Sequence, residues 1–230
     1  MKLSTEKAYQ GDIERFLMWG GAVPAPEKMV ASYLYEHSDS HKFATLARWR
    51  VSLGKAHSVQ GLKDPTKTEL VNAVLKGIKQ EHGREQRRVA PLTSLEAKVL
   101  LNTMGGSLKD LRDKALIGVG FFGGLRRSEI TNLTVENITR MARYGELTLS
   151  TGRVVVIPLD QVKDLDEWLA TSGIETGAVF RSINRHGQIS GKPLTGHGVA
   201  RIIKERFASI CMDPALYSVG SLRSGLLGRF

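Results

Sequence analysis

Two arginine-bearing segments, far apart in the sequence, contain residue types suited to phosphate chemistry. Arg126 follows a Gly-Gly-Leu turn and precedes Glu129 by three residues, and Arg223 follows Ser-Leu near the end of the chain. Cleaving a phosphodiester without a metal requires a nucleophile, a proton donor and fixed positive charge around the nonbridging oxygens. Arginine suits the last task, because its guanidinium stays charged and donates two parallel hydrogen bonds. Arg126 and Arg223 are therefore candidate phosphate ligands, and Glu129, one helical turn on, is a candidate for holding the Arg126 guanidinium.

The charge balance points to a polyanionic partner. Lysine and arginine number 33 against 23 acidic residues, which gives a formal net charge of +10 and a sequence pI of about 9.8. Nucleic acid is the first candidate partner, and a merely soluble basic protein is the alternative.

The sequence offers little for a metal or cofactor. Its single cysteine, Cys211, excludes an internal disulfide and a Cys-rich zinc site. No D-x-D or E-x-K carboxylate cluster lies at the end of a predicted strand, where a metal-dependent nuclease would need one, so that class ranks well behind, and no cofactor is expected. The charged start and the absence of a long apolar run predict a cytoplasmic, nucleoid-associated protein with no membrane partner.

Helical periodicity and turn residues predict two domains. Residues 1–83 show apolar spacing of three and four throughout, which indicates four helices and an all-α domain. The spacing Thr66-x-x-Glu69 predicts a capping box for the fourth helix. A polar, basic linker is expected at 84–92, followed by a second domain at 93–230.

The second domain is predicted to be mainly helical with a small sheet. Its first helix should begin at a capping box formed by Thr93 and Glu96. Residues 145–150 and 153–159 alternate or are β-branched around a Thr-Gly turn, as in a hairpin. Helical spacing returns at 160–171 and 195–210. The predicted fold class is thus mainly α with a small antiparallel sheet, in two domains.

Three segments carry a resemblance to a known family. GFFGGLRRSEITNLTVENI (120–138) and LYSVGSLRSGLLGRF (216–230) resemble the first and second arginine boxes of the tyrosine recombinase, or phage integrase, family. Residues 46–83 look like the corresponding stretch of Cre-type recombinases. Arginines at helix ends usually form solvated salt bridges, but the two boxes together favour a site.

The resemblance implies a DNA clamp made of a helical core-binding domain and a catalytic domain. It implies site-specific integration, excision or resolution of double-stranded DNA through a 3′-phosphotyrosyl intermediate, by tetramers assembled on paired sites. Arg126, Glu129 and Arg223 take the catalytic positions. Arg127 is expected at the surface or on the DNA backbone.

Three departures from the family pattern qualify this expectation. Gly220 stands where the second box has histidine, the turn Ser150–Gly152 contains no lysine, and none of the five tyrosines takes the nucleophile's place by motif. Two explanations stay open: a longer active enzyme, whose catalytic domain is incomplete at the C-terminus here, or a cleavage-incompetent relative that only binds DNA. Either way, the chain is expected to bind DNA without cutting it.

Basic residues of the helical domain are candidate phosphate contacts, which would make DNA affinity salt-dependent. Gln80 and His82 are weaker candidates for reading bases. Taken singly, such residues more often belong to a solvated face. His197, at the start of a helix, is more typical of a surface histidine than of a phosphate contact. The DNA-binding candidates are Lys42, Arg48, Arg50, Lys55, Lys76, Lys79, Gln80 and Arg84.

Overall fold

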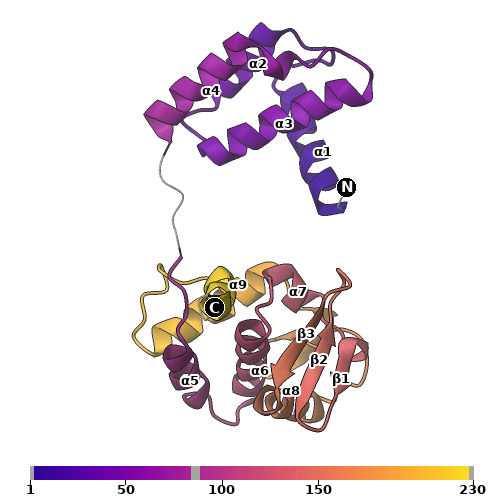
Figure 1. Cartoon of the computed structure of the whole chain (residues 1–230), viewed down its shortest axis with the longest axis vertical. Helices are drawn as coiled ribbons and strands as arrows, with labels where there is room; N and C mark the ends of the chain where they lie inside the picture. Colours follow the sequence, from indigo (N-terminus) through magenta and orange to yellow (C-terminus); the bar gives the residue numbers. More distant parts are fainter. Residues whose placement is uncertain (1–2, 84–88, 228–230) are drawn as a thin grey trace. The chain divides into compact units, whose positions relative to one another are not determined.

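The computed structural model describes residues 3–83 and 89–227, with side chains for 5–83 and 89–225. The chain divides into two compact units, residues 1–87 and 88–230; Figure 1 colours the chain continuously from its N-terminus to its C-terminus. Each unit is described by itself below. The boundaries predicted from the sequence, at 83 and 93, stay a prediction.

The first unit is built from helices packed on an aromatic core. They are α1 (Leu3–Met18), α2 (Glu27–Glu36), α3 (Phe43–Val59) and α4 (Glu69–His82), with a 3₁₀ turn at Pro65–Lys67. Helix α1 packs on α3, and α2 packs on α4. Phe16, Tyr33 and Trp49 are fully buried at the centre. Apolar residues recur every three or four positions along these helices, so each helix has one buried face.

One expected helix start in this unit is wrong. Thr66 belongs to the 3₁₀ turn, where its main-chain N–H and its hydroxyl both donate to the Asp64 carboxylate. Helix α4 begins three residues later, with Thr68 as N-cap. The local Asx-type bond to Asp64 competes with the capping box and prevails.

The second unit surrounds the long, almost fully buried helix α6 (Leu108–Phe122). Helix α5 (Ser94–Asn102) precedes it and opens with the predicted capping box, in which Thr93 and Glu96 bond reciprocally. The short helix α7 (Arg127–Thr131) follows, and α8 (Leu159–Ser172), α9 (Gly196–Ser209) and α10 (Val219–Leu227) complete the helices. Figure 1 shows α6 and α8 beside the sheet.

Two small antiparallel sheets lie in this unit. Strands β1 (Ile138–Arg140), β2 (Tyr144–Thr148) and β3 (Val154–Pro158) pair in that order. The β2–β3 hairpin is the one predicted from the sequence, with Thr148 opposite Val154. Strands β4 (Arg181–Ile183) and β5 (Ile189–Pro193) form a second, two-stranded sheet that residue patterns did not indicate. The predicted fold class, mainly α with a small antiparallel sheet, is confirmed.

Candidate phosphate-binding site

A glycine turn at the end of α6 delivers Arg126 to the surface. Gly124 has a φ of +57°, which favours glycine, and Leu125 N–H donates to the Gly120 carbonyl at 3.0 Å. Arg126 is extended (φ −77°, ψ 157°) and is the N-cap residue of α7. Its side chain therefore leaves the backbone beside the first turn of that helix.

Glu129 holds the main chain of Arg126 rather than its guanidinium. The Glu129 Oε2 accepts the Arg126 N–H at 2.7 Å and also accepts from Arg153 Nη2 at 3.0 Å. No contact joins the Glu129 carboxylate to the Arg126 guanidinium among the described residues. The expected pairing of these two side chains is thus corrected, because the helix-capping N–H takes the carboxylate instead.

Arg223 reaches the same region from α10. That helix lies close against α6, since a methyl group built on Gly120 would lie 2.9 Å from Cδ1 of Leu222. The buried Ser221 carbonyl accepts the Leu92 N–H at 3.0 Å, which ties α10 to the segment before α5. Leu222 is buried in the core, and the next residue, Arg223, lines a surface pocket.

The two arginines line one pocket of about 360 Å³. Arg127 also lines this pocket, although the sequence suggested only a surface or DNA-backbone role for it. The pocket therefore joins two adjacent arginines, Arg126 and Arg127, with Arg223 from a distant segment of the unit. The pocket is lined by Leu125, Arg126, Arg127, Ala200, Ser218, Val219, Gly220 and Arg223.

These three guanidinium groups have no acidic partner within the described part of the chain, whereas Arg140 and Arg206 do. Arg140 pairs with Asp166 at 2.6 Å, and Arg206 pairs with two carboxylates. Positive charge gathered in a pocket without internal compensation favours an anion from outside. Such an anion would receive planar, two-donor hydrogen bonds, the geometry that suits phosphate oxygens.

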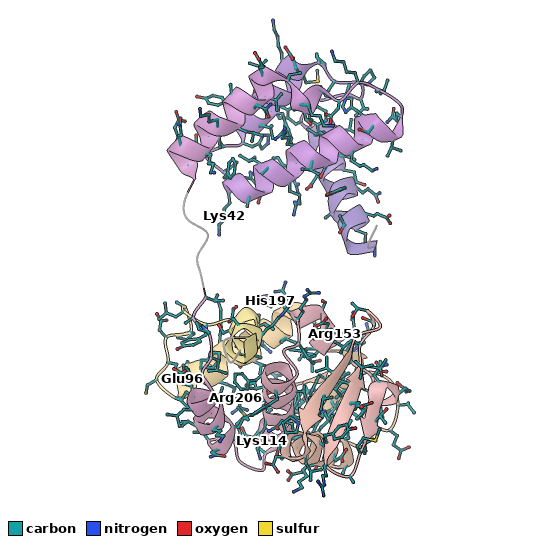
Figure 2. All side chains as sticks on the ribbon, viewed as in Figure 1. Lys42, Glu96, Lys114, Arg153, His197 and Arg206 are labelled. Carbon is teal, nitrogen blue, oxygen red and sulfur yellow. The ribbon has the colours of Figure 1, made fainter. Side chains whose placement is uncertain are left out.

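The departures noted in the sequence lie at or near this pocket. Gly220 lines it and contributes no side chain. The β2–β3 turn is tight, with Leu149 N–H donating to the Arg153 carbonyl at 2.9 Å and Gly152 at a φ of +80°. Arg153 follows this turn and points its Nη2 at Glu129. Figure 2 shows Arg153 between the hairpin and α7.

Residue type alone does not predict the roles of two further residues, Ser218 and His197. Ser218 lines the pocket, and its Oγ accepts the Gly220 N–H at 3.0 Å. A serine ahead of a helix is too common to signal a site. His197 is exposed in the first turn of α9 and does not line the pocket. Figure 2 shows it at the surface of that helix.

A second arginine cluster in this unit is internally paired. Asp113, 4% exposed, accepts from Arg112 and from Arg206, with Nη2 distances of 2.7 Å in both cases. Asp110 accepts from Arg206 and from Ser107. The Ser107 hydrogen bond is the largest cause that lowers the pKa of the Asp110 carboxyl below its usual range. This network holds α6 and α9 together.

In the first unit, two of the predicted DNA contacts are engaged with the chain itself. Arg48 binds the buried Asp12 carboxylate through Nε at 2.9 Å and Nη2 at 2.7 Å. The hydrogen bond to Asp12 raises the pKa of Arg48. Arg50 Nε donates to the Thr66 carbonyl at 3.0 Å. Both arginines therefore have structural partners that their residue type did not reveal.

The other predicted contacts of this unit are exposed. Lys76, Lys79 and Gln80 lie at positions that share one face of α4. Lys42 precedes α3 as its N-cap residue, and Lys55 lies on α3. Arg84 lies outside the described residues. Their role in DNA binding stays a prediction.

In the described ranges, no group of three or more His, Cys, Asp or Glu side chains could hold a metal ion. None of the helices there is long and apolar enough to cross a membrane.

Comparison with known proteins gives sequence relatives of one kind. The chain is 30% identical over 246 residues to an integrase/recombinase XerD homolog of Selenomonas ruminantium, covering 96% of this chain and 72% of the relative. It is 27% identical over 213 residues to a putative tyrosine recombinase of Caldanaerobacter subterraneus, covering 88% and 69%. No family model matches the chain.

Solved structures with the same fold include three recombinase–DNA complexes. One is XerH site-specific recombinase bound to a palindromic difH substrate (TM-score 0.61, 18% identity), and another is a lambda integrase dimer bound to a COC′ core site (0.62, 18%). The third is the Tn1549 transposon integrase with transposon right end DNA (0.67, 15%). The matches cover 87%, 98% and 100% of this chain. The chain spans 58%, 64% and 81% of those proteins.

Proposed function

Because the chain belongs to the tyrosine recombinase family, we propose that it binds a double-stranded DNA recombination site and holds one phosphodiester of that site in the arginine pocket. The observation that carries this proposal is the convergence of Arg126, Arg127 and Arg223 on one pocket without acidic partners in the described chain. A phosphate group supplies the negative charge that these guanidinium groups lack.

In this function Arg126 and Arg223 are catalytic residues. Phosphodiester cleavage gathers negative charge on the nonbridging oxygens, and guanidinium groups already in place stabilise that charge without reorganising. The family's reaction then conserves the bond energy in a 3′-phosphotyrosyl link, from which a free 5′ hydroxyl displaces the tyrosine. The pocket supplies the electrostatic half of this chemistry.

The proposed cleavage also requires a tyrosine nucleophile. Among the described residues no tyrosine lines the pocket. We therefore expect the 230-residue polypeptide to bind DNA without forming a covalent adduct, so cleavage by the family's mechanism requires a tyrosine supplied from elsewhere. The Arg153 guanidinium is a poor proton donor, because arginine hardly gives up its proton.

The first unit supplies sequence-independent affinity and register. Lys76 and Lys79 present charge on one face of α4 for phosphate contacts, and Gln80 lies on that face for a base edge. Self-association into a tetramer on paired sites is part of the same proposal. It would bring two DNA sites together for strand exchange.

A second candidate function is DNA binding without catalysis, as in a regulator derived from a recombinase. Gly220 in the pocket and the lysine-free hairpin turn favour it. The two functions differ in whether a longer chain, or an added tyrosine-bearing segment, restores cleavage.

The experiment starts with selection of bound duplexes from a randomised double-stranded DNA library, using the 230-residue chain. Affinity for the enriched duplex is then measured for the wild type, Arg126→Ala and Arg223→Ala at several salt concentrations. Each variant should lose roughly ten- to a hundredfold in affinity, the cost of a charge-assisted hydrogen bond. Each should also lower the salt slope by about one phosphate contact.

Arg185→Ala is the control, since Arg185 lies on the β4–β5 loop away from the pocket lining. Equal losses of DNA affinity in all three variants would mean that the losses come from the lower net charge of the protein and not from the pocket. Unchanged affinity in Arg126→Ala and Arg223→Ala would contradict the proposal that a DNA phosphate binds in the pocket.

A further inference from the structure

The buried carboxylate of Glu129 has one basic partner within the described chain, and that partner comes from the hairpin. Glu129 is 4% exposed, and its Oε2 accepts both the Arg126 main-chain N–H and Arg153 Nη2. A carboxylate so removed from water requires hydrogen bonds and a compensating charge. Arg153, which is 45% exposed in its side chain, supplies that charge.

The same hairpin touches the chain on the other side of Arg126. A methyl group built on Gly123 would lie 3.2 Å from Cγ1 of Val155, so β3 supports the glycine turn. Arg153, two residues earlier, contacts the first turn of α7 through Glu129. The hairpin therefore contacts both the segment before Arg126 and the segment after it.

We propose that Arg153 is a positioning residue for Arg126: by neutralising Glu129 it holds the Arg126 main chain, and with it the direction in which the guanidinium enters the pocket. Arg153 does not line the pocket. Its effect on a bound phosphate passes through Arg126, and this inference rests on the proposed function of the pocket.

The geometry states which replacement should preserve the role. Of the Arg153 guanidinium nitrogens, only Nη2 makes a hydrogen bond within the described residues, at 3.0 Å. Lysine can provide one cationic nitrogen, whereas glutamine provides no charge. Arg153→Lys should therefore retain the function that Arg153→Gln loses.

The experiment measures affinity for the selected DNA duplex in a double-mutant cycle between Arg153→Gln and Arg126→Ala. Arg153→Gln alone should weaken binding about fivefold, which lies within the usual range of coupling between residues of one network. In the Arg126→Ala background it should cause no further loss. Arg153→Lys should bind within about twofold of the wild type.

Arg140→Gln is the matched control. Its side chain is 46% exposed, as Arg153 is 45% exposed, and it pairs with Asp166, so the substitution removes an arginine of similar exposure from strand β1 of the sheet that Arg153 adjoins. It should leave binding unchanged, and its melting temperature sets the reference for Arg153→Gln.

A fivefold loss that persists without Arg126, or that lysine does not restore, would overturn the positioning role in favour of a direct contact or a general loss of structure. Full affinity in Arg153→Gln would overturn it as well. If Arg126→Ala itself binds like the wild type, the proposed pocket function fails, and Arg153 has nothing to position. Loss in Arg126→Ala without loss in Arg153→Gln refutes the positioning role alone.

Discussion

Two arginine clusters of the second unit differ in their partners. Those of the pocket lack carboxylate partners in the described residues, whereas Arg112 and Arg206 share Asp113. Residue type is the same in both clusters, so burial and pairing separate a binding site from a structural network. Charge that the fold compensates stabilises the fold, and charge that it leaves uncompensated is available to a ligand.

Asp113→Asn should destabilise the unit severely. The substitution leaves Arg112, 8% exposed in its side chain, without its carboxylate. Removing one partner of a buried ionic network typically costs about 3–5 kcal/mol. Denaturant unfolding of the variant should show this loss in the free energy of unfolding.

Asp166→Asn is its control, because Asp166 is 41% exposed and pairs with the half-exposed Arg140. Loss of an exposed pair costs no more than about 1 kcal/mol. Equal destabilisation by the two substitutions would mean that the Asp113 network contributes no more than a surface ion pair.

At the scale of elements, the contact between α6 and α10 decides where Arg223 lies. Gly120 permits the approach of Leu222, and a methyl group there would also lie 3.2 Å from Cδ1 of Ile130. A methyl group at this position would require the end of the buried Leu222 side chain, one residue before Arg223, to move within the core.

Gly120→Ala should destabilise the protein relative to Gly77→Ala by roughly 1–3 kcal/mol, the usual cost of overpacking a core. Both are glycines inside helices, so both substitutions gain helix propensity. A methyl group on Gly77 meets no atom within 4 Å. Chemical denaturation gives the free energy of unfolding of both variants. An equal gain in both would show that the contact between α6 and α10 accommodates the methyl group without loss of stability.

The sequence predicted the elements whose signals are local. The Thr93–Glu96 capping box and the β2–β3 hairpin depend on neighbours a few residues apart, and both are present. The predicted Thr66–Glu69 capping box is absent because Thr66 donates instead to Asp64, which is also a near neighbour in the sequence. Strands β4 and β5 escaped prediction because they are short and lack alternating apolar residues.

For the candidate site, the sequence predicted the residues but not the side chains that they contact. Arg126 and Arg223 were predicted, and the structure brings both to one pocket. The Glu129–Arg153 pair and the Arg48–Asp12 pair join residues from different elements. Such contacts arise from packing between elements, which periodicity within one segment does not encode.

At the scale of the whole molecule, each unit has its own hydrophobic core. The core of the first unit includes Phe16, Tyr33 and Trp49, and that of the second includes Phe121 and Trp168. A domain with a core of its own can fold alone.

A fragment of residues 1–83 should therefore fold without the rest of the chain. Its circular dichroism should show helix, with a cooperative thermal transition, because Trp49 and Tyr33 are fully buried by residues of the same unit. A fragment in which Trp49 is replaced by alanine should lose that transition, since a large core side chain is worth about 3–5 kcal/mol. A featureless spectrum for the wild-type fragment would contradict independent folding.

The placement of the tryptophans has an optical consequence. The sequence contains three, of which Trp19 and Trp49 belong to the first unit and Trp168 to the second. The Trp168 indole is enclosed and donates to the Val179 carbonyl at 2.9 Å, whereas Trp19 lies near the surface and donates to Glu36. Replacing Trp19 and Trp49 by phenylalanine would leave tryptophan emission that comes from one unit alone, so DNA titrations and unfolding could be followed there without an attached dye.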